Sequence, residues 1–163
     1  IDEDQPLSTS DQGFSNGSTF QVDLTAGTNL SEALFFGVNA TYNTTSTGEF
    51  YDGMDIMDID GDGAGFYGAA AYLQLTTSET FAIGTRIEYF NVFNDGLSVI
   101  GLDDDGDGNV LDITLTGRAS IGNLTLIPEL RFDAASEDDT FLNNDLEDSK
   151  SLASFIFAAV FTF

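Results

Sequence analysis

Apolar and polar residues alternate along seven stretches of this chain, each about ten residues long or more. Successive side chains of a β-strand point to opposite faces, so a period of two predicts strands with two unlike faces. The seven predicted strands span residues 18–28, 33–44, 65–76, 80–92, 110–120, 124–135 and 152–163. The expected fold class is therefore all-β.

Every charged residue inside the predicted strands falls on the face opposite the apolar residues. In the fourth strand, Phe81, Ile83 and Ile87 share one face, whereas Arg86 and Glu88 share the other. The eight charged residues on this second face are Asp23, Arg86, Glu88, Asp112, Arg118, Glu129, Arg131 and Asp133. The face without charge would be buried against a second layer in a soluble β-protein, or would contact lipid in a membrane barrel.

The connections between the predicted strands are alternately short and long. Short ones cover residues 29–32, 77–79 and 121–123, and long ones cover 45–64, 93–109 and 136–151. The long connections and the opening segment 1–17 hold 21 of the 28 Asp and Glu residues. Outer-membrane barrels show this asymmetry, with tight periplasmic turns and long polar outer loops. We therefore predict one antiparallel up-and-down transmembrane barrel segment, residues 18–163, with residues 1–17 in an outer loop.

The last predicted strand ends the sequence on an aromatic residue, and Phe155, Phe157, Phe161 and Phe163 share one of its faces. This strand resembles the C-terminal strand of bacterial outer-membrane β-barrels, which carries the signal read by the barrel-assembly machinery. The resemblance implies that machinery and outer-membrane lipid as partners. The alternative is an ordinary hydrophobic edge strand, although such a long aromatic edge would promote aggregation of a soluble monomer.

Composition narrows the chemistry that the chain can perform. A formal net charge of -24 argues against a nucleic-acid partner, because phosphates would be repelled. There is no His, Cys or Trp, which excludes His-dependent nucleophiles, thiolate zinc sites and disulfides. Glu129 and Asp133 could act as acid and base, but nothing places them across a cleft, so we expect no enzyme activity.

Two Asp-rich segments in the long connections, residues 58–63 and 103–108, match the first half of a calcium-binding EF-hand loop. The carboxylates concerned are those of Asp58, Asp60, Asp62, Asp103, Asp105 and Asp107. The bidentate Glu at the twelfth position is missing, since Ala69 and Thr114 stand there. Either these segments bind Ca²⁺ with carbonyl and water ligands, or they are solvated acidic loops; no cofactor is required.

A longer resemblance covers about the second half of the chain, residues 80–163. It rests on the run 122–133, GNLTLIPELRFD, on the run 86–90, RIEYF, and on the acidic loop and final strand that follow. These segments resemble the C-terminal part of the OmpL-like β-barrel porin family of Gram-negative bacteria. The resemblance implies an outer-membrane location and a channel for passive diffusion of small hydrophilic solutes.

The odd number of predicted strands implies that the barrel has further strands besides these seven. If the last strand ends in the periplasm, counting back through seven strands places residues 1–17 outside the cell. Single-chain bacterial barrels have an even number of strands and both termini in the periplasm. We therefore expect these 163 residues to be the C-terminal part of a larger barrel, completed by N-terminal strands or other envelope subunits, and not to close alone.

The leading functional hypothesis is a porin-like channel. Its inward charges would form either a pore-lining ladder or an interior salt-bridge network. An acidic mouth predicts a preference for cations. Two alternatives stay open: a barrel without a pore that acts as an adhesin, surface scaffold or subunit of an envelope complex, and a secreted, calcium-stabilised soluble β-domain.

Overall fold

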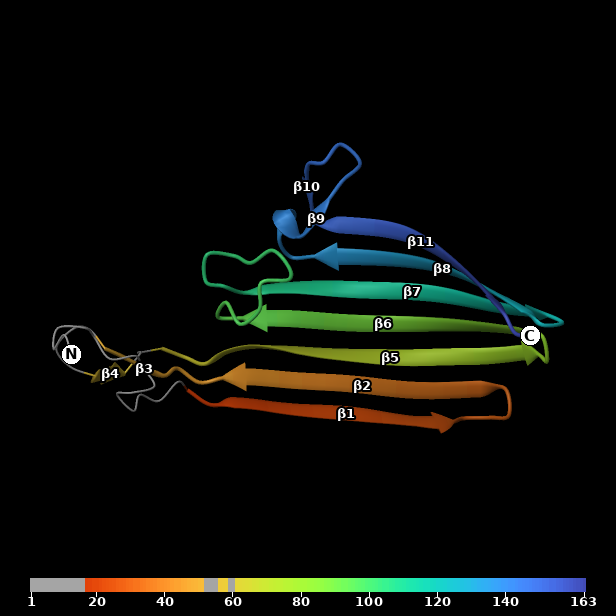
Figure 1. Ribbon diagram of the computed structural model, residues 1–163, viewed down its shortest axis with the longest axis horizontal. Coiled ribbons are helices and arrows are strands. Elements are labelled where there is room, and N and C mark those ends of the chain that lie inside the picture. Colours follow the sequence, from red (N-terminus) through yellow and green to blue (C-terminus); the bar gives the residue numbers. More distant parts are fainter. Residues whose placement is uncertain (1–16, 52–55, 59–60) are drawn as a thin grey trace, which may run out of the picture.

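The computed structural model describes residues 17–51, 56–58 and 61–163, and its main feature is a seven-stranded antiparallel sheet (Figure 1). The strands of this sheet, in spatial order, are β1 (Thr19–Asn29), β2 (Leu34–Thr45), β5 (Ala64–Ser78), β6 (Phe81–Phe93), β7 (Gly108–Ile121), β8 (Leu124–Ala135) and β11 (Ser151–Phe161). Spatial order follows chain order, so the sheet has the predicted up-and-down topology. All seven predicted strands are confirmed, with bounds that agree within two residues.

The long connections contain small elements that the sequence pattern did not predict. One connection holds a hairpin of β3 (Glu49–Tyr51) and β4 (Ile56–Asp58). Another holds the 3-10 helix η1 (Asp138–Thr140), followed by a hairpin of β9 (Phe141–Leu142) and β10 (Asp148–Ser149). Among the described residues, no helix is long and apolar enough to cross a membrane.

The three short connections lie at one end of the sheet, together with the C-terminus, and the long ones lie at the other end (Figure 1). Two of the short turns use a serine side chain. Ser31 Oγ accepts the N–H of Leu34 at 3.1 Å, and Ser78 Oγ accepts the N–H of Phe81 at 3.0 Å. In the third turn, Gly122 has a φ of 60°, which suits the first central position of a two-residue type II′ hairpin.

Pro128 lies in β8, an inner strand, although proline normally occurs at sheet edges because it cannot donate a ladder hydrogen bond. The β7–β8 register runs without interruption to the Thr116–Glu129 pair and resumes at the Ala119–Leu126 pair. Opposite the proline ring lies Gly117, where an added Cβ would be 3.3 Å from the Pro128 Cγ. The ladder is therefore interrupted locally, and a residue without a side chain makes room for the ring.

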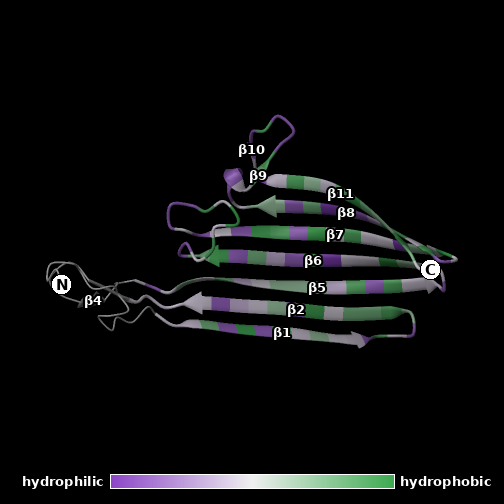
Figure 2. Ribbon diagram, in the orientation of Figure 1, coloured by the Kyte–Doolittle hydropathy of each residue, from purple (hydrophilic) through white to green (hydrophobic). Residues whose placement is uncertain are grey.

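The sheet has no second layer within the described part of the chain, and its burial pattern is the reverse of that of a soluble protein. The buried hydrophobic residues there are Ala70, Ala82, Val92 and Val110, all on the side that carries the charges. Large apolar side chains of the other side are exposed, among them Phe132 at 49% and Phe155 at 64%. Hydrophobic and hydrophilic residues alternate along the strands in Figure 2.

Strands β1 and β11 form the two edges, and no other described strand pairs with either free edge. The sheet is therefore open, in agreement with the expectation that these strands alone do not close a barrel. The predicted outer segment 1–17 lies outside the described residues except for Gly17.

Candidate functional site

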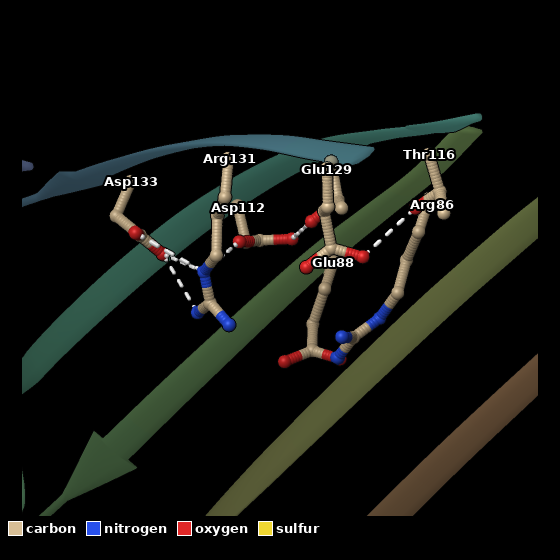
Figure 3. Close-up of polar contacts among 8 residues, drawn as sticks. Arg86, Glu88, Asp112, Thr116, Glu129, Arg131 and Asp133 are labelled. Atoms are coloured by element: carbon tan, nitrogen blue, oxygen red, sulfur yellow. Dashed lines mark hydrogen bonds and ion pairs between the residues drawn. The ribbon is translucent and has the colours of Figure 1, made fainter. Parts of the chain in front are cut away.

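Strand register places the eight predicted charged residues on one face of the sheet, which we call the charged face; the opposite one is the apolar face. On β6 and β7, Glu88 lies opposite Asp112, which in turn lies opposite Asp133 on β8. Six of the eight come together on β6, β7 and β8, where their side chains point to the same side (Figure 3). This charge cluster consists of Arg86, Glu88, Asp112, Glu129, Arg131 and Asp133.

Arg131 holds two buried carboxylates at the centre of the charge cluster. Its Nη2 donates to Asp133 Oδ1 at 2.8 Å, and its Nε lies 2.6 Å from Asp112 Oδ2. The side chains of Asp112 and Asp133 are only 3% and 4% exposed. Thr114 Oγ1 donates to Asp112 Oδ1 at 2.9 Å. Since buried charges are tolerated only when paired, Arg131 is the main electrostatic partner of both carboxylates.

The rest of the cluster lies beside this centre. Arg86 forms an ion pair with Glu88, and its guanidinium carbon lies 5.8 Å from the centroid of the Tyr72 ring. Glu129 accepts a hydrogen bond of 2.8 Å from Thr116 Oγ1. Two arginines against four carboxylates leave the cluster with a formal charge of about -2 at neutral pH. The arrangement is thus largely an ion-pair network that retains excess negative charge.

The other two predicted residues lie apart from the cluster. Asp23, on β1, accepts hydrogen bonds from Thr41 on β2 and from the neighbouring Gln21, within a ladder of uncharged polar groups. Arg118 lies opposite Ala82 near the short turns and forms no ion pair with any described residue. Sequence parity correctly placed both on the charged face but could not show that they stand alone.

Two long connections fold back over the loop end of the charged face. Val92 is fully buried there, at 0% exposure. Phe90 and Val110 of the same region line a cavity of about 170 Å³ together with Val99 and Ile100 of the β6–β7 connection and Phe141 of β9. The N–H of Gly101 donates to Thr140 Oγ1 at 3.1 Å and ties the two connections together. This contact was not predicted, although the apolar run 97–102 inside an acidic loop was a visible signal.

An aromatic girdle lies on the apolar face near the loop end of the strands. The Tyr42 and Phe93 rings are stacked with centroids 6.2 Å apart, and Tyr67 lies 6.3 Å from Tyr89 and 6.4 Å from Phe93. Amphipathic aromatic rings are typical of the boundary between hydrocarbon and water. Sequence reasoning missed the girdle because register is needed to bring Tyr42, Tyr67 and Tyr89 side by side.

The Asp-rich segments remain candidates for calcium. Asp58 and Asp60 have side chains outside the described part, and Asp62 is exposed. In the second segment, Asp103 Oδ1 accepts the N–H groups of Asp105 at 3.0 Å and Asp107 at 2.9 Å. Within the described residues, no group of three or more acidic side chains is placed to hold a metal ion. The calcium hypothesis stays a prediction.

A second loop repeats these hydrogen bonds and was not predicted. Asn143 Oδ1 accepts the N–H groups of Asp145 at 2.8 Å and Glu147 at 3.0 Å. Leu146 has a φ of 62°, at the place where Gly106 has a φ of 79° in the first loop. Asparagine and aspartate are interchangeable as acceptors in such turns, so the two loops share one backbone design.

The predicted assembly signal lies on the apolar face of the edge strand β11. Phe155, Phe157 and Phe161 lie opposite Leu130, Pro128 and Leu124 of β8. Phe163 follows the end of the strand and is fully exposed. The role of these rings in assembly stays a prediction.

Comparison with known proteins identifies one family. The family described as "Putative beta-barrel porin-2, OmpL-like" matches residues 3–163, nearly the whole chain and more than the 80–163 on which the resemblance was first seen. No curated protein and no solved structure matches the chain.

Proposed function

The chain belongs to the OmpL-like β-barrel porin family, and on that premise we propose that it forms part of the wall of an outer-membrane channel in a Gram-negative bacterium. The channel would allow small hydrophilic solutes to diffuse passively. The observation that carries the proposal is the contrast between the two faces of the seven-stranded sheet: one is apolar and exposed, and the other carries every charged residue of its seven strands. Lipid would cover the first face, and the aqueous lumen would lie behind the second.

The dimensions of the apolar face support this orientation. On β6, the apolar-face residues Phe81 and Tyr89 are eight positions apart, which corresponds to about 27 Å along a strand. Strands of outer-membrane barrels tilt by roughly 40° and carry an apolar band about 25 Å tall between aromatic girdles. After allowance for tilt, the distance between these two rings agrees with such a band to within a few ångströms.

Charge supports a preference for cations. The charge cluster has an excess of carboxylates, and most acidic residues of the chain lie in the long connections at one end of the sheet. An acidic entrance raises the local concentration of cations and lowers that of anions. The same field weakens as salt is added, since the screening length falls to about 3 Å at 1 M.

The first prediction concerns ion selectivity. In a planar bilayer that separates dilute from concentrated KCl, the closed barrel, made of these 163 residues together with the strands that complete its wall, should give a reversal potential of the sign set by K⁺. Glu129→Gln removes a charge from the cluster and should reduce that potential, whereas Glu32→Gln, in a short turn, should not. An anion-selective current through the unmodified closed barrel would contradict the proposed cation preference, and no current through the reconstituted closed barrel would contradict the channel.

A barrel without an open pore is the second candidate. It is favoured by the two connections that cover the loop end of the charged face and by the ion pairs that occupy the same face. Side chains that meet in this way could fill a narrow lumen. The conductance measurement separates the two candidates directly.

A further inference from the structure

We propose that a hollow on the charged face, centred on Gly84, binds the sugar ring of a neutral carbohydrate. This inference rests on the proposed function, because it names a class of hydrophilic solute for the same channel wall. The hollow has a volume of about 380 Å³, which is within the range of roughly 300 to 1,000 Å³ usual for small-molecule sites. The buried carboxylates of Asp112 and Asp133 do not line it.

Strand register creates the hollow. One row of paired residues crosses the charged face from β2 to β8, and its members are Phe35, Gln74, Gly84, Thr116 and Glu129. Gly84 stands in the middle of this row. Apart from its chain neighbours, an added Cβ at Gly84 would have a single atom within 4 Å, the Leu73 carbonyl oxygen at 3.5 Å. The centre of the row is therefore open, and longer side chains stand on both sides of it.

Phe35 supplies an aromatic surface at one end of the hollow. Among the inner strands β2, β5, β6, β7 and β8, which the structure describes in full, it is the only large apolar side chain of the charged face that is exposed, at 39%. The end of its ring lies over Gly27 and Gly37, where an added Cβ would be 2.6 Å and 3.1 Å from ring carbons. The ring thus rests on the sheet with much of its surface uncovered. Lipid would lie on the opposite face of the sheet, so only water or a solute can cover this surface.

The polar groups around the hollow are within reach of a solute. Gln74 is exposed, and its amide can both donate and accept. Glu129 is half-buried, and its Oε2 accepts the Thr116 hydroxyl at 2.8 Å, which leaves its other oxygen for a ligand (Figure 3). Arg131 uses Nε and Nη2 to bind Asp133, whereas its Nη1 takes part in neither bond. Because a sugar hydroxyl both donates and accepts, it can pair with all three kinds of group.

A pyranose ring suits this combination better than other small solutes. Its hydroxyls point outward around the ring, and its C–H groups form apolar faces that can stack on the negative face of an aromatic ring. An inorganic ion would leave Phe35 in contact with water. An apolar solute would cover Gln74 and Glu129 without giving them hydrogen bonds, which costs free energy. A linear polyol offers the hydroxyls but no rigid apolar face.

The test compares methyl β-D-glucopyranoside with D-sorbitol by isothermal titration calorimetry on the closed barrel, in micelles of a detergent without a sugar head group. Both ligands are uncharged and carry several hydroxyls, but only the glucoside has a rigid ring. The glucoside should bind about tenfold more tightly. Phe35→Leu keeps an apolar side chain without the aromatic ring and should abolish most of this preference. The matched control Phe36→Leu, next on the same strand but on the apolar face, should preserve it.

Equal affinities for the two ligands would overturn the inference, as would a preference that survives in Phe35→Leu. The second result would mean that the ring only covers Gly27 and Gly37. If Phe35→Leu does not fold, Gln74→Ala at an exposed position should weaken glucoside binding by about threefold or more, and unchanged binding would overturn the site.

Measurements of current separate this site from the proposed function. A closed barrel that conducts K⁺ but shows no glucoside preference would retain the channel and lose the sugar site. A closed barrel that binds the glucoside with the expected preference but carries no current would retain the site and lose the channel.

Discussion

Replacing Leu73 by Arg should severely destabilise the protein in a bilayer, whereas the same replacement at Gln74 should have little effect. The two residues are neighbours on β5 and lie on opposite faces of the sheet. Leu73 lies on the apolar face and pairs with Thr85 of β6. Thr85 is midway along β6 between Phe81 and Tyr89, so Leu73 is expected near the middle of the bilayer. An arginine on the lipid face of an outer-membrane barrel costs about 2 to 4 kcal/mol at the bilayer midplane.

This comparison isolates the environment of the residue, because the two variants carry the same added side chain on one strand. Reversible unfolding by denaturant in lipid vesicles measures the loss, and Leu73→Ala separates the cost of the charge from the cost of the lost leucine. Equal stability of Leu73→Arg and Gln74→Arg would mean that the apolar face does not contact lipid. It would remove the main support for the proposed channel.

Replacing Arg131 by Gln should also produce a large loss of stability. The substitution leaves the carboxylates of Asp112 and Asp133 without their cation, and both side chains are almost fully buried. Breaking a buried ion pair on one side costs about 3 to 5 kcal/mol. Because the Arg131 side chain is 39% exposed, water can replace some of the lost interaction, and a value of about 3 kcal/mol is expected.

Arg118→Gln is the matched control, since it removes the same charge from the same face where no described carboxylate is paired with it. Its effect should stay below about 0.5 kcal/mol, as for an unpaired surface substitution. Adding Asp112→Asn to Arg131→Gln should recover part of the loss, because one uncompensated charge disappears. If the double variant were less stable than Arg131→Gln, the ion pairs would not be the cause. Denaturant unfolding in the same vesicles provides all three measurements.

Most of the sheet could be predicted from the sequence because strand alternation is a local property. The parity of Arg86, Glu88 and Arg131 within their own strands was enough to place them on one face. Their partners were not predictable in the same way, since the contact of Arg131 with Asp112 depends on the register between two strands. The break beside Pro128 similarly requires knowing that Gly117 lies opposite it.

The position of the two folded connections over the charged face could not be predicted from their amino-acid composition. Their many acidic residues predict polar outer loops, but composition alone does not show that Val99, Ile100 and Phe141 pack toward the charged face. Residues 99 and 141 are far apart in the sequence and meet only because β7 and β8 return the chain to the same end of the sheet. The sequence of either segment alone therefore does not show that it contacts the other segment.

The direction of the two edge strands limits how the wall can be completed. In an up-and-down sheet of seven strands, the two edge strands β1 and β11 run in the same direction. Two copies standing upright side by side in one membrane would therefore bring β1 of one against β11 of the other in parallel. Closing the barrel with antiparallel pairs alone instead requires an odd number of additional strands between β1 and β11. The added strand that pairs with β1 must run in the opposite direction to β1.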